Sequence, residues 1–168
     1  RAMISPDAGE RWQAYAQTHL EVSSRPYHRL TVTTAPLGVT EGPFADDPEQ
    51  PLYIITAHNP GRLASDEDNE WAHQSLWETL LPLSPSPIGQ ARGYSPDGAH
   101  SELSFAVGRI SRQEALDVAA EFGQEAIFVW TVDQLEIVAT DGSRVDAYGW
   151  ISREGSFTPI DSGLGHQT

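Results

Sequence analysis

The sequence predicts an α+β protein, a two-layer ferredoxin-like sandwich (split βαβ, antiparallel sheet) with an N-terminal helix and extra C-terminal strands. The main observation is the order of periodicities between residues 52 and 131, which is strand, helix, strand, strand, helix, strand. In this split βαβ order the first and third strands are antiparallel neighbours at the sheet centre, and the fourth flanks the first. The second observation is that both helices begin at capping signals and carry apolar stripes at three- and four-residue steps.

The segment ahead of this core predicts a helix, a strand and a loop. Ser5-Pro6, with acidic residues in the following turn, indicates a helix that runs to about Leu20. Alternation over residues 29–34 predicts a short strand. Residues 36–51 contain four prolines, two glycines and four acidic residues without a period, which is typical of a loop.

The core elements follow from short local patterns. Residues 52–57 are an apolar run typical of a buried strand, and residues 65–81 carry the first capped helix. Residues 88–94 lie among prolines, so we expect a short strand at a sheet edge. Residues 100–107 alternate as in a strand buried on one side, with the apolar face made by Leu103, Phe105 and Val107.

The second half of the chain predicts another helix and three strands. Ser111 and Glu114 form a capping box, and Gly123 marks the helix end. Strands are expected over residues 126–131, 135–139 and 145–151.

These elements fit a single domain. No apolar run approaches the ~20 residues of a membrane span, and the N-terminus lacks the tracts of a secretory signal, so we expect a soluble, cytoplasmic protein. We expect Arg1 and Ala2 to be an expression remnant ahead of Met3. The domain would cover residues 3–161, with its core at 52–139, the helix, strand and acidic loop at 3–51, and a mobile tail at 162–168.

Composition disfavours several classes of function. Ten basic residues, all of them Arg, against 24 acidic ones give a net charge of −14, which disfavours a protein that grips the nucleic-acid backbone. The absence of cysteine removes disulfides, thiol nucleophiles and thiolate metal sites. Residues 41–70 hold eight acids and one Arg, a net −7. This stretch is explained either by a solvated loop and helix start, or by an acidic face that binds a basic protein or mimics DNA.

The expected topology gathers polar residues at one sheet edge. They come from the ends of different elements, so the cluster depends on the predicted fold. Its members are His58, Asn59, Asn69, His73, Arg92, Glu102 and Gln124.

Each of these residues has a structural and a functional interpretation. Asn59 suits a turn, Asn69 a helix start and Gln124 a helix end, and together with Glu102 they would form a network that ties loops to the sheet. Alternatively, Glu102 is a general base or a cation ligand, the amides orient a small polar ligand, and Arg62 or Arg92 holds an anionic group. The spacing does not select between these interpretations.

Catalytic motifs give little guidance. The chain has no phosphate-binding loop, no H-E-x-x-H and no G-x-S-x-G elbow. A zinc site would need His58, His73 and His100 to meet Glu102, which the topology permits and the sequence does not demand. We therefore predict neither a metal nor a cofactor.

Two short motifs carry a family resemblance. The segment Ile54-Ile55-Thr56-Ala57-His58-Asn59-Pro60, together with Phe122-Gly123-Gln124-x-Ala126, resembles the bacterial family called domain of unknown function 3293, over residues of about 50–140. The resemblance implies a stand-alone bacterial domain and no particular activity. It also implies that the characteristic polar positions of the family are Asn59, Asn69, Glu102 and Gln124.

Three functions remain open. The favoured one is a binding or interaction module whose polar cluster takes a small polar ligand or a basic protein. The second is a small-molecule enzyme that uses Glu102 as acid or base, and the third is an acidic partner-binding or DNA-mimic protein. A cleft that contains Glu102, Asn59 and Gln124 would favour the enzyme, whereas side chains bonded only to backbone would count against it.

Overall fold

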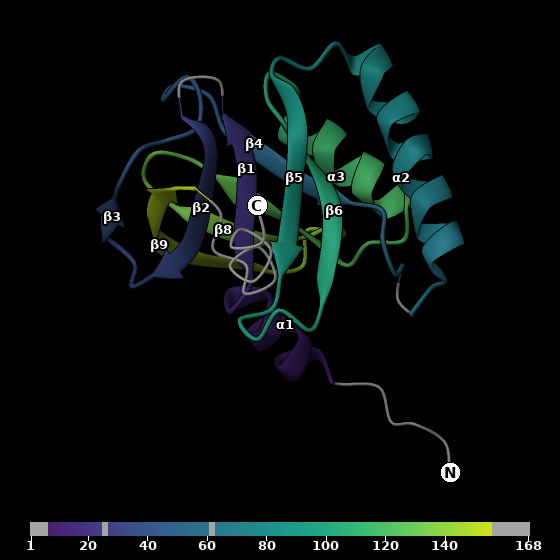
Figure 1. Cartoon of the computed structure of the whole chain (residues 1–168), viewed down its shortest axis with the longest axis horizontal. Helices are drawn as coiled ribbons and strands as arrows, with labels where there is room; N and C mark the ends of the chain where they lie inside the picture. The colour runs from purple at the N-terminus through teal and green to yellow at the C-terminus, as the bar shows by residue number, and fades with distance from the viewer. Residues whose placement is uncertain (1–6, 25–26, 61–62, 156–168) are drawn as a thin grey trace, which may run out of the picture.

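The computed structural model describes residues 7–24, 27–60 and 63–155. Within these ranges, nine strands form one sheet and the helices lie outside it or at one end (Figure 1). The predicted remnant at residues 1–2, the Ser5-Pro6 helix start and the tail at 162–168 lie outside the described residues. The elements are α1 (Ala8–Ala16), β1 (His19–Ser24), β2 (His28–Ala35), β3 (Thr40–Glu41), β4 (Leu52–Thr56), α2 (Asp66–Leu80), η1 (Leu81–Leu83), β5 (Ile88–Tyr94), β6 (Ser101–Val107), α3 (Arg112–Glu121), β7 (Ala126–Trp130), β8 (Leu135–Ala139) and β9 (Val145–Glu154).

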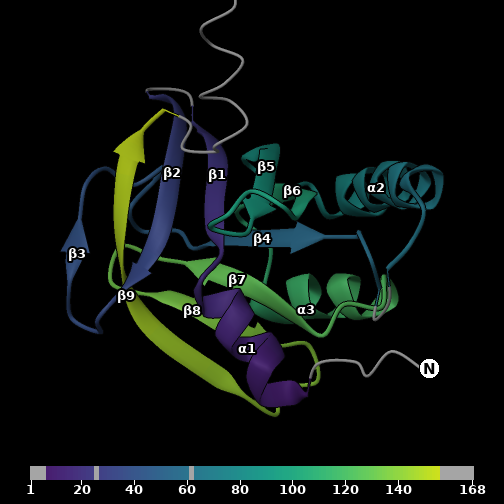
Figure 2. The same cartoon turned by 60° about the horizontal axis from the view of Figure 1, so that its bottom comes forward.

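The sheet closes on itself. Its strand order is β2-β1-β5-β6-β4-β7-β8-β9, and β2 pairs back onto β9, so eight antiparallel strands make a closed barrel (Figures 1 and 2). The two-residue strand β3 adds to β9 in parallel. The predicted two-layer ferredoxin-like α+β sandwich is therefore wrong, because closure replaces an open sheet that has two free edges.

Part of the predicted pairing is nevertheless confirmed. β4 lies between β6 and β7, and β5 lies on the far side of β6, as the split βαβ order requires. The error lies in what flanks these four strands. β1 was not predicted, because the expected first helix runs to about Leu20 and includes the first two residues of this strand, and residues 21–24 were given no element. Since β1 pairs with β5, residues 88–94 are an internal strand and not the predicted edge.

The barrel interior is one apolar cluster with residues from all eight strands. Aromatic rings fill the end of the interior that lies at the start of β4. The ring centroids of Phe44 and Trp130 are 4.6 Å apart, and those of Trp130 and Trp150 are 5.3 Å apart. The outer face of β4, β6 and β7 packs against α2 and α3 in a second cluster. β6 is therefore covered on both faces and not on one, because Phe105 lies under the helices while Ala106 lies in the barrel.

The helix caps hold the helices in place. The side chain of Ser65 accepts the backbone N–H of Asp68, and Ser111 and Glu114 form the predicted capping box. α1 begins after Asp7 and packs Trp12 against β8 at one end of the barrel (Figure 2). Among the described residues, no helix is long and apolar enough to cross a membrane.

Closure depends on a change of partner within β9. Its first residues pair with β8, and from Gly149 onward it pairs with β2. A Cβ atom at Gly149 would overlap the carbonyl oxygens of Pro36 and Val39, so the chain that connects β2 to β3 can lie against β9 only at a glycine.

We predict that Gly149→Ala lowers the free energy of unfolding by about 3 kcal/mol, because backbone atoms cannot move aside for the added methyl group. The matched control is Gly89→Ala, whose Cβ would meet Ser23 at an ordinary 3.7 Å. Urea unfolding measures both variants. Equal stability of the two variants would contradict the proposed role of Gly149.

Candidate functional site

A cleft of about 810 Å³ lies at the end of the barrel that α1 covers. Its walls come from α1, the β4–α2 connection, the β5–β6 hairpin and the residues around the start of β7. Apolar side chains from the barrel line its depth, and polar groups converge on it from several elements. The apolar set includes Leu20, Ile54, Phe128 and Ile137, and the polar set includes Asn59, Glu102 and Gln124.

Strand alternation places Glu102 in this cleft. Along β6, Ala106 faces the barrel interior, so Glu102, four residues earlier, lies on the same face. Its partner across the β5–β6 ladder is Gly93, which also lines the cleft. A Cβ at Gly93 would come 3.3 Å from the Thr18 side chain and 3.6 Å from the Leu20 side chain, so these two residues already occupy the space beside the glycine.

A side-chain network holds the Glu102 carboxylate. Asn59 donates from Nδ2 to Glu102 Oε2 at 2.7 Å, and Asn59 Oδ1 accepts from Asn69 Nδ2 at 3.1 Å and from the Ala64 backbone at 2.9 Å. Asn69 Oδ1 in turn accepts the Asn59 backbone N–H at 2.9 Å. Asn69 is buried, and its helix start is thereby tied to the end of β4. The network therefore fixes both the loop and the carboxylate.

The backbone of Asn59 explains the residue type. Its φ of 50° lies in the left-handed region, which Asn tolerates better than most residues because its short polar side chain bonds locally. The same Asn59 side chain thus accepts the Ala64 backbone N–H in the turn and donates to Glu102.

Burial dominates the electrostatics of Glu102. It raises the pKa of this carboxyl, and the Asn59 hydrogen bond and the charge of His100 partly offset the rise. Within the described part of the chain, no hydrogen bond or ion pair occupies Oε1 of Glu102. One carboxylate oxygen is therefore held by the protein while the other can accept a hydrogen bond in the cleft.

Gln124 and the two predicted histidines lie beside this network. Gln124 donates to the backbone carbonyl of His58 at 3.0 Å and bonds only backbone, as its structural interpretation requires. The rings of His58 and His73 lie 5.9 Å apart, and His73 stacks on Phe105 at 4.3 Å. Burial lowers the pKa of both histidines, which favours their neutral forms.

The two candidate arginines are not part of the cleft. Arg92 stands opposite Glu21 in the β1–β5 register, and the side chains of Arg92 and Glu102 lie on opposite faces of the sheet. Arg92 lines a separate hollow of about 350 Å³ with Glu21 and Arg29. Arg62 lies outside the described residues. Across the described ranges, no group of three or more His, Asp or Glu side chains is placed to hold a metal ion.

Sequence reasoning missed the contact that docks α1 as a wall of the cleft. Arg11 donates to both oxygens of Glu125, at 2.9 and 3.0 Å, and the Tyr15 hydroxyl donates to Glu125 at 2.7 Å. These bonds lower the pKa of Glu125 to about 2. The partners are more than 100 positions apart in the chain, so the only signal was that Glu125 lies inside the F-G-Q-x-A motif.

We predict that Asn59→Gly raises the pKa of Glu102, because it removes the donor that stabilises the charged carboxylate. Glycine accepts the positive φ, so the variant tests the side chain and not the backbone. Carbon-detected NMR titration measures the pKa, and urea unfolding should show a loss of about 2 kcal/mol. Gln74→Ala, which loses one exposed bond to Glu78, is the control. An unchanged Glu102 titration would refute the assignment of the network.

The Arg11–Glu125 contact predicts a pH dependence of stability. Because the folded pKa of Glu125 is depressed from 4.5 to about 2, its contribution is complete above pH 4.5 and is lost as pH falls towards 2. We expect Glu125→Gln to be less stable than the wild type at neutral pH, with a difference that shrinks over this window. Urea unfolding at several pH values measures it, with Glu121→Gln as control. A difference that persists at about pH 2 would contradict the ion pair as its source.

Comparisons with known proteins show a resemblance to one family and indicate no function. A search of curated proteins found no match. A family model described as Protein of unknown function (DUF3293) matches residues 55–127. This range contains Asn59, Asn69, Glu102 and Gln124. Over the part of the chain that builds the cleft network, the protein therefore resembles the DUF3293 family.

Proposed function

We propose that this protein binds a small organic molecule in the cleft at the α1 end of the barrel, with Glu102 as the polar anchor. The observation that carries the proposal is the Glu102 carboxylate itself. One of its oxygens is held by Asn59, and the other faces a cleft with apolar walls. A pre-positioned polar group in a mostly apolar pocket is the usual composition of a small-molecule site.

The position of the cleft supports the proposal. The ends of β-barrels are frequent ligand sites, because the closed sheet supplies a rigid apolar wall while loops supply polar groups. Here the wall comes from six strands, and the loop residue Asn59 is restrained because its side-chain amide makes hydrogen bonds at both ends. The carboxylate would therefore lose little entropy when a ligand binds.

An acid or base role for Glu102 is the second candidate. It is favoured by the position of this carboxyl, which lines the cleft and is partly buried, and burial raises its pKa. The Glu102→Gln variant distinguishes an anchor from an acid or base when binding and turnover are both measured for a substrate of the wild type. Loss of turnover with binding retained would support acid–base chemistry, and loss of both would support an anchor.

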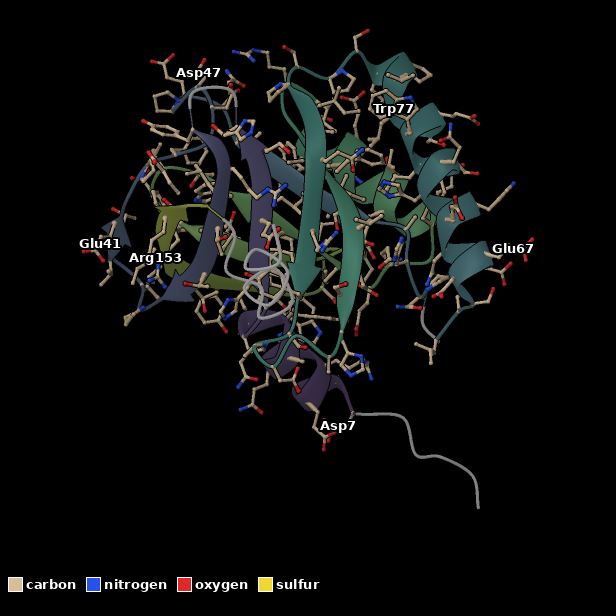
Figure 3. All side chains as sticks on the ribbon, viewed as in Figure 1. Asp7, Glu41, Asp47, Glu67, Trp77 and Arg153 are labelled. Carbon is tan, nitrogen blue, oxygen red and sulfur yellow. The ribbon has the colours of Figure 1, made fainter. Side chains whose placement is uncertain are left out.

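The acidic stretch at residues 41–70 offers less support for a partner-binding face. Figure 3 places Glu41 and Asp47 on the barrel side of the molecule and Glu67 at the opposite side, on α2. Asp46 and Asp47 also pair with Arg109, at 3.7 and 3.1 Å. The charges of this stretch are thus divided between two sides and partly neutralised, which counts against one acidic docking face.

We predict that benzyl alcohol, as a probe with an apolar ring and one polar group, binds in the cleft. NMR chemical-shift changes should centre on Asn59, Glu102 and the β5–β6 hairpin. Ala99→Trp, at an exposed position on the cleft rim, should block the entrance and weaken binding by about tenfold or more. Gln74→Trp, on the exposed face of α2 and outside the cleft lining, is the control. Shifts scattered over the surface, or unaffected by Ala99→Trp, would refute the proposal.

A further inference from the structure

We infer that the ligand of the cleft is a cation, an organic ammonium ion that carries an apolar group. This inference rests on the proposed binding function and adds the chemical class of the ligand. Three properties of the cleft support it: the sign of its charges, the geometry of Glu102 and the apolar depth below it.

In the part of the cleft lining that the structure describes, the Asp and Glu side chains have no Arg among them. Asp66 and Glu70 stand on the rim at the start of α2, and Glu102 lies inside. No Arg belongs to the described part of the lining, and the chain has no Lys at all. Because the net charge of the whole protein is −14, the wider field adds to the local one. Such a cleft concentrates cations and repels anions.

The geometry of Glu102 suits an ammonium donor. An ammonium group has three N–H donors and no acceptor, so it complements a carboxylate oxygen that has no partner among the described residues. Asn59 holds the other oxygen at 2.7 Å and prevents the carboxylate from turning away. A carboxylate ligand would meet Glu102 as a like charge, and an alcohol would offer a single neutral donor.

The depth of the cleft requires an apolar part in the same ligand. Below Glu102 the walls are Leu20, Ile54, Phe128 and Ile137. Leu20, Ile54 and Ile137 are already buried, but the half-buried Phe128 and the exposed Leu63 also line the cleft. A hydrocarbon group of the ligand would cover these two side chains, whereas a bare inorganic cation would leave them in contact with water. The volume of about 810 Å³ is sufficient for a ring or a short chain together with the charged group.

The burial of Glu102 gives this ligand class a second signature. Since burial raises the pKa of the free carboxyl, a bound cation must lower it again, and binding is coupled to release of the Glu102 proton. Affinity for an ammonium ligand should therefore fall as pH decreases, while affinity for a neutral ligand of the same shape should stay constant. His58 and His73 also face this region, and their protonation at low pH would act in the same direction. The other charged or titratable side chains of the described lining include His100, Asp66 and Glu70.

The test compares three probes of equal shape: benzylamine, benzyl alcohol and benzoate. Titration calorimetry and NMR shifts on the full chain should give benzylamine an affinity about tenfold higher than benzyl alcohol, and benzoate the lowest. Glu102→Gln keeps an acceptor for Asn59 and should abolish the preference for the amine. The control Glu49→Gln removes an exposed carboxylate before β4, whereas the cleft lies beyond the end of β4, and should leave the preference unchanged.

The outcomes separate the two proposals. Benzyl alcohol that binds in the cleft as tightly as benzylamine, or benzoate that binds best, would overturn the cationic class and leave small-molecule binding intact. If none of the three probes changes the NMR chemical shifts of the cleft residues, both the binding proposal and the cationic ligand class are refuted. If Glu102→Gln does not fold, the order of the three probe affinities for the wild type decides. A benzylamine affinity that does not fall on acidification, relative to benzyl alcohol, would overturn the inference.

Discussion

The hydrogen-bonded seam between β2 and β9 is the constraint on which the rest of this structure depends. Six residue pairs, from Leu30 with Glu154 to Ala35 with Gly149, join the two ends of the sheet. Without this seam the sheet would have free edges, and its inner face would need another layer to cover it. With it, one apolar interior receives residues from every strand, and the helices are free to cover the outside and one end.

The barrel is filled unequally, and this produces the cleft. At the start of β4, aromatic rings of Phe44, Trp130 and Trp150 occupy the interior. At the other end of β4, Glu102 and its ladder partner Gly93 line the cleft, and Ala14 and Tyr15 of α1 form part of its wall. Because α1 is held there by Glu125, a carboxylate just before β7, the cleft has walls that come from distant parts of the chain and fit together only in the closed barrel.

The element boundaries could be predicted wherever local chemistry decides them. Ser65, Ser111 and Gly123 mark helix ends through bonds to their own neighbours, and β4 to β8 follow from short apolar runs. β1 (His19–Ser24) was not predicted because the expected first helix ran to about Leu20, which took the first apolar residue of the short alternation Leu20-Glu21-Val22. Of the predicted polar cluster, the structure brings together Asn59, Asn69 and Glu102, because Asn59 makes hydrogen bonds to both of the others. Arg92 lies on the opposite face of the sheet.

By itself, the sequence determined the helices, most strands, the pairing of the four central strands and the residues that form the amide and carboxylate network. These properties rest on local periodicity and on topology rules that act between neighbouring elements. Only the tertiary structure decided that the sheet closes, that α1 forms a wall of the cleft, and that one oxygen of Glu102 faces an apolar space. Each of these depends on contacts between residues far apart in the chain, such as Leu30 with Glu154 and Arg11 with Glu125. Local patterns carry no record of such contacts, because the free energy that selects them arises only when the whole barrel is packed.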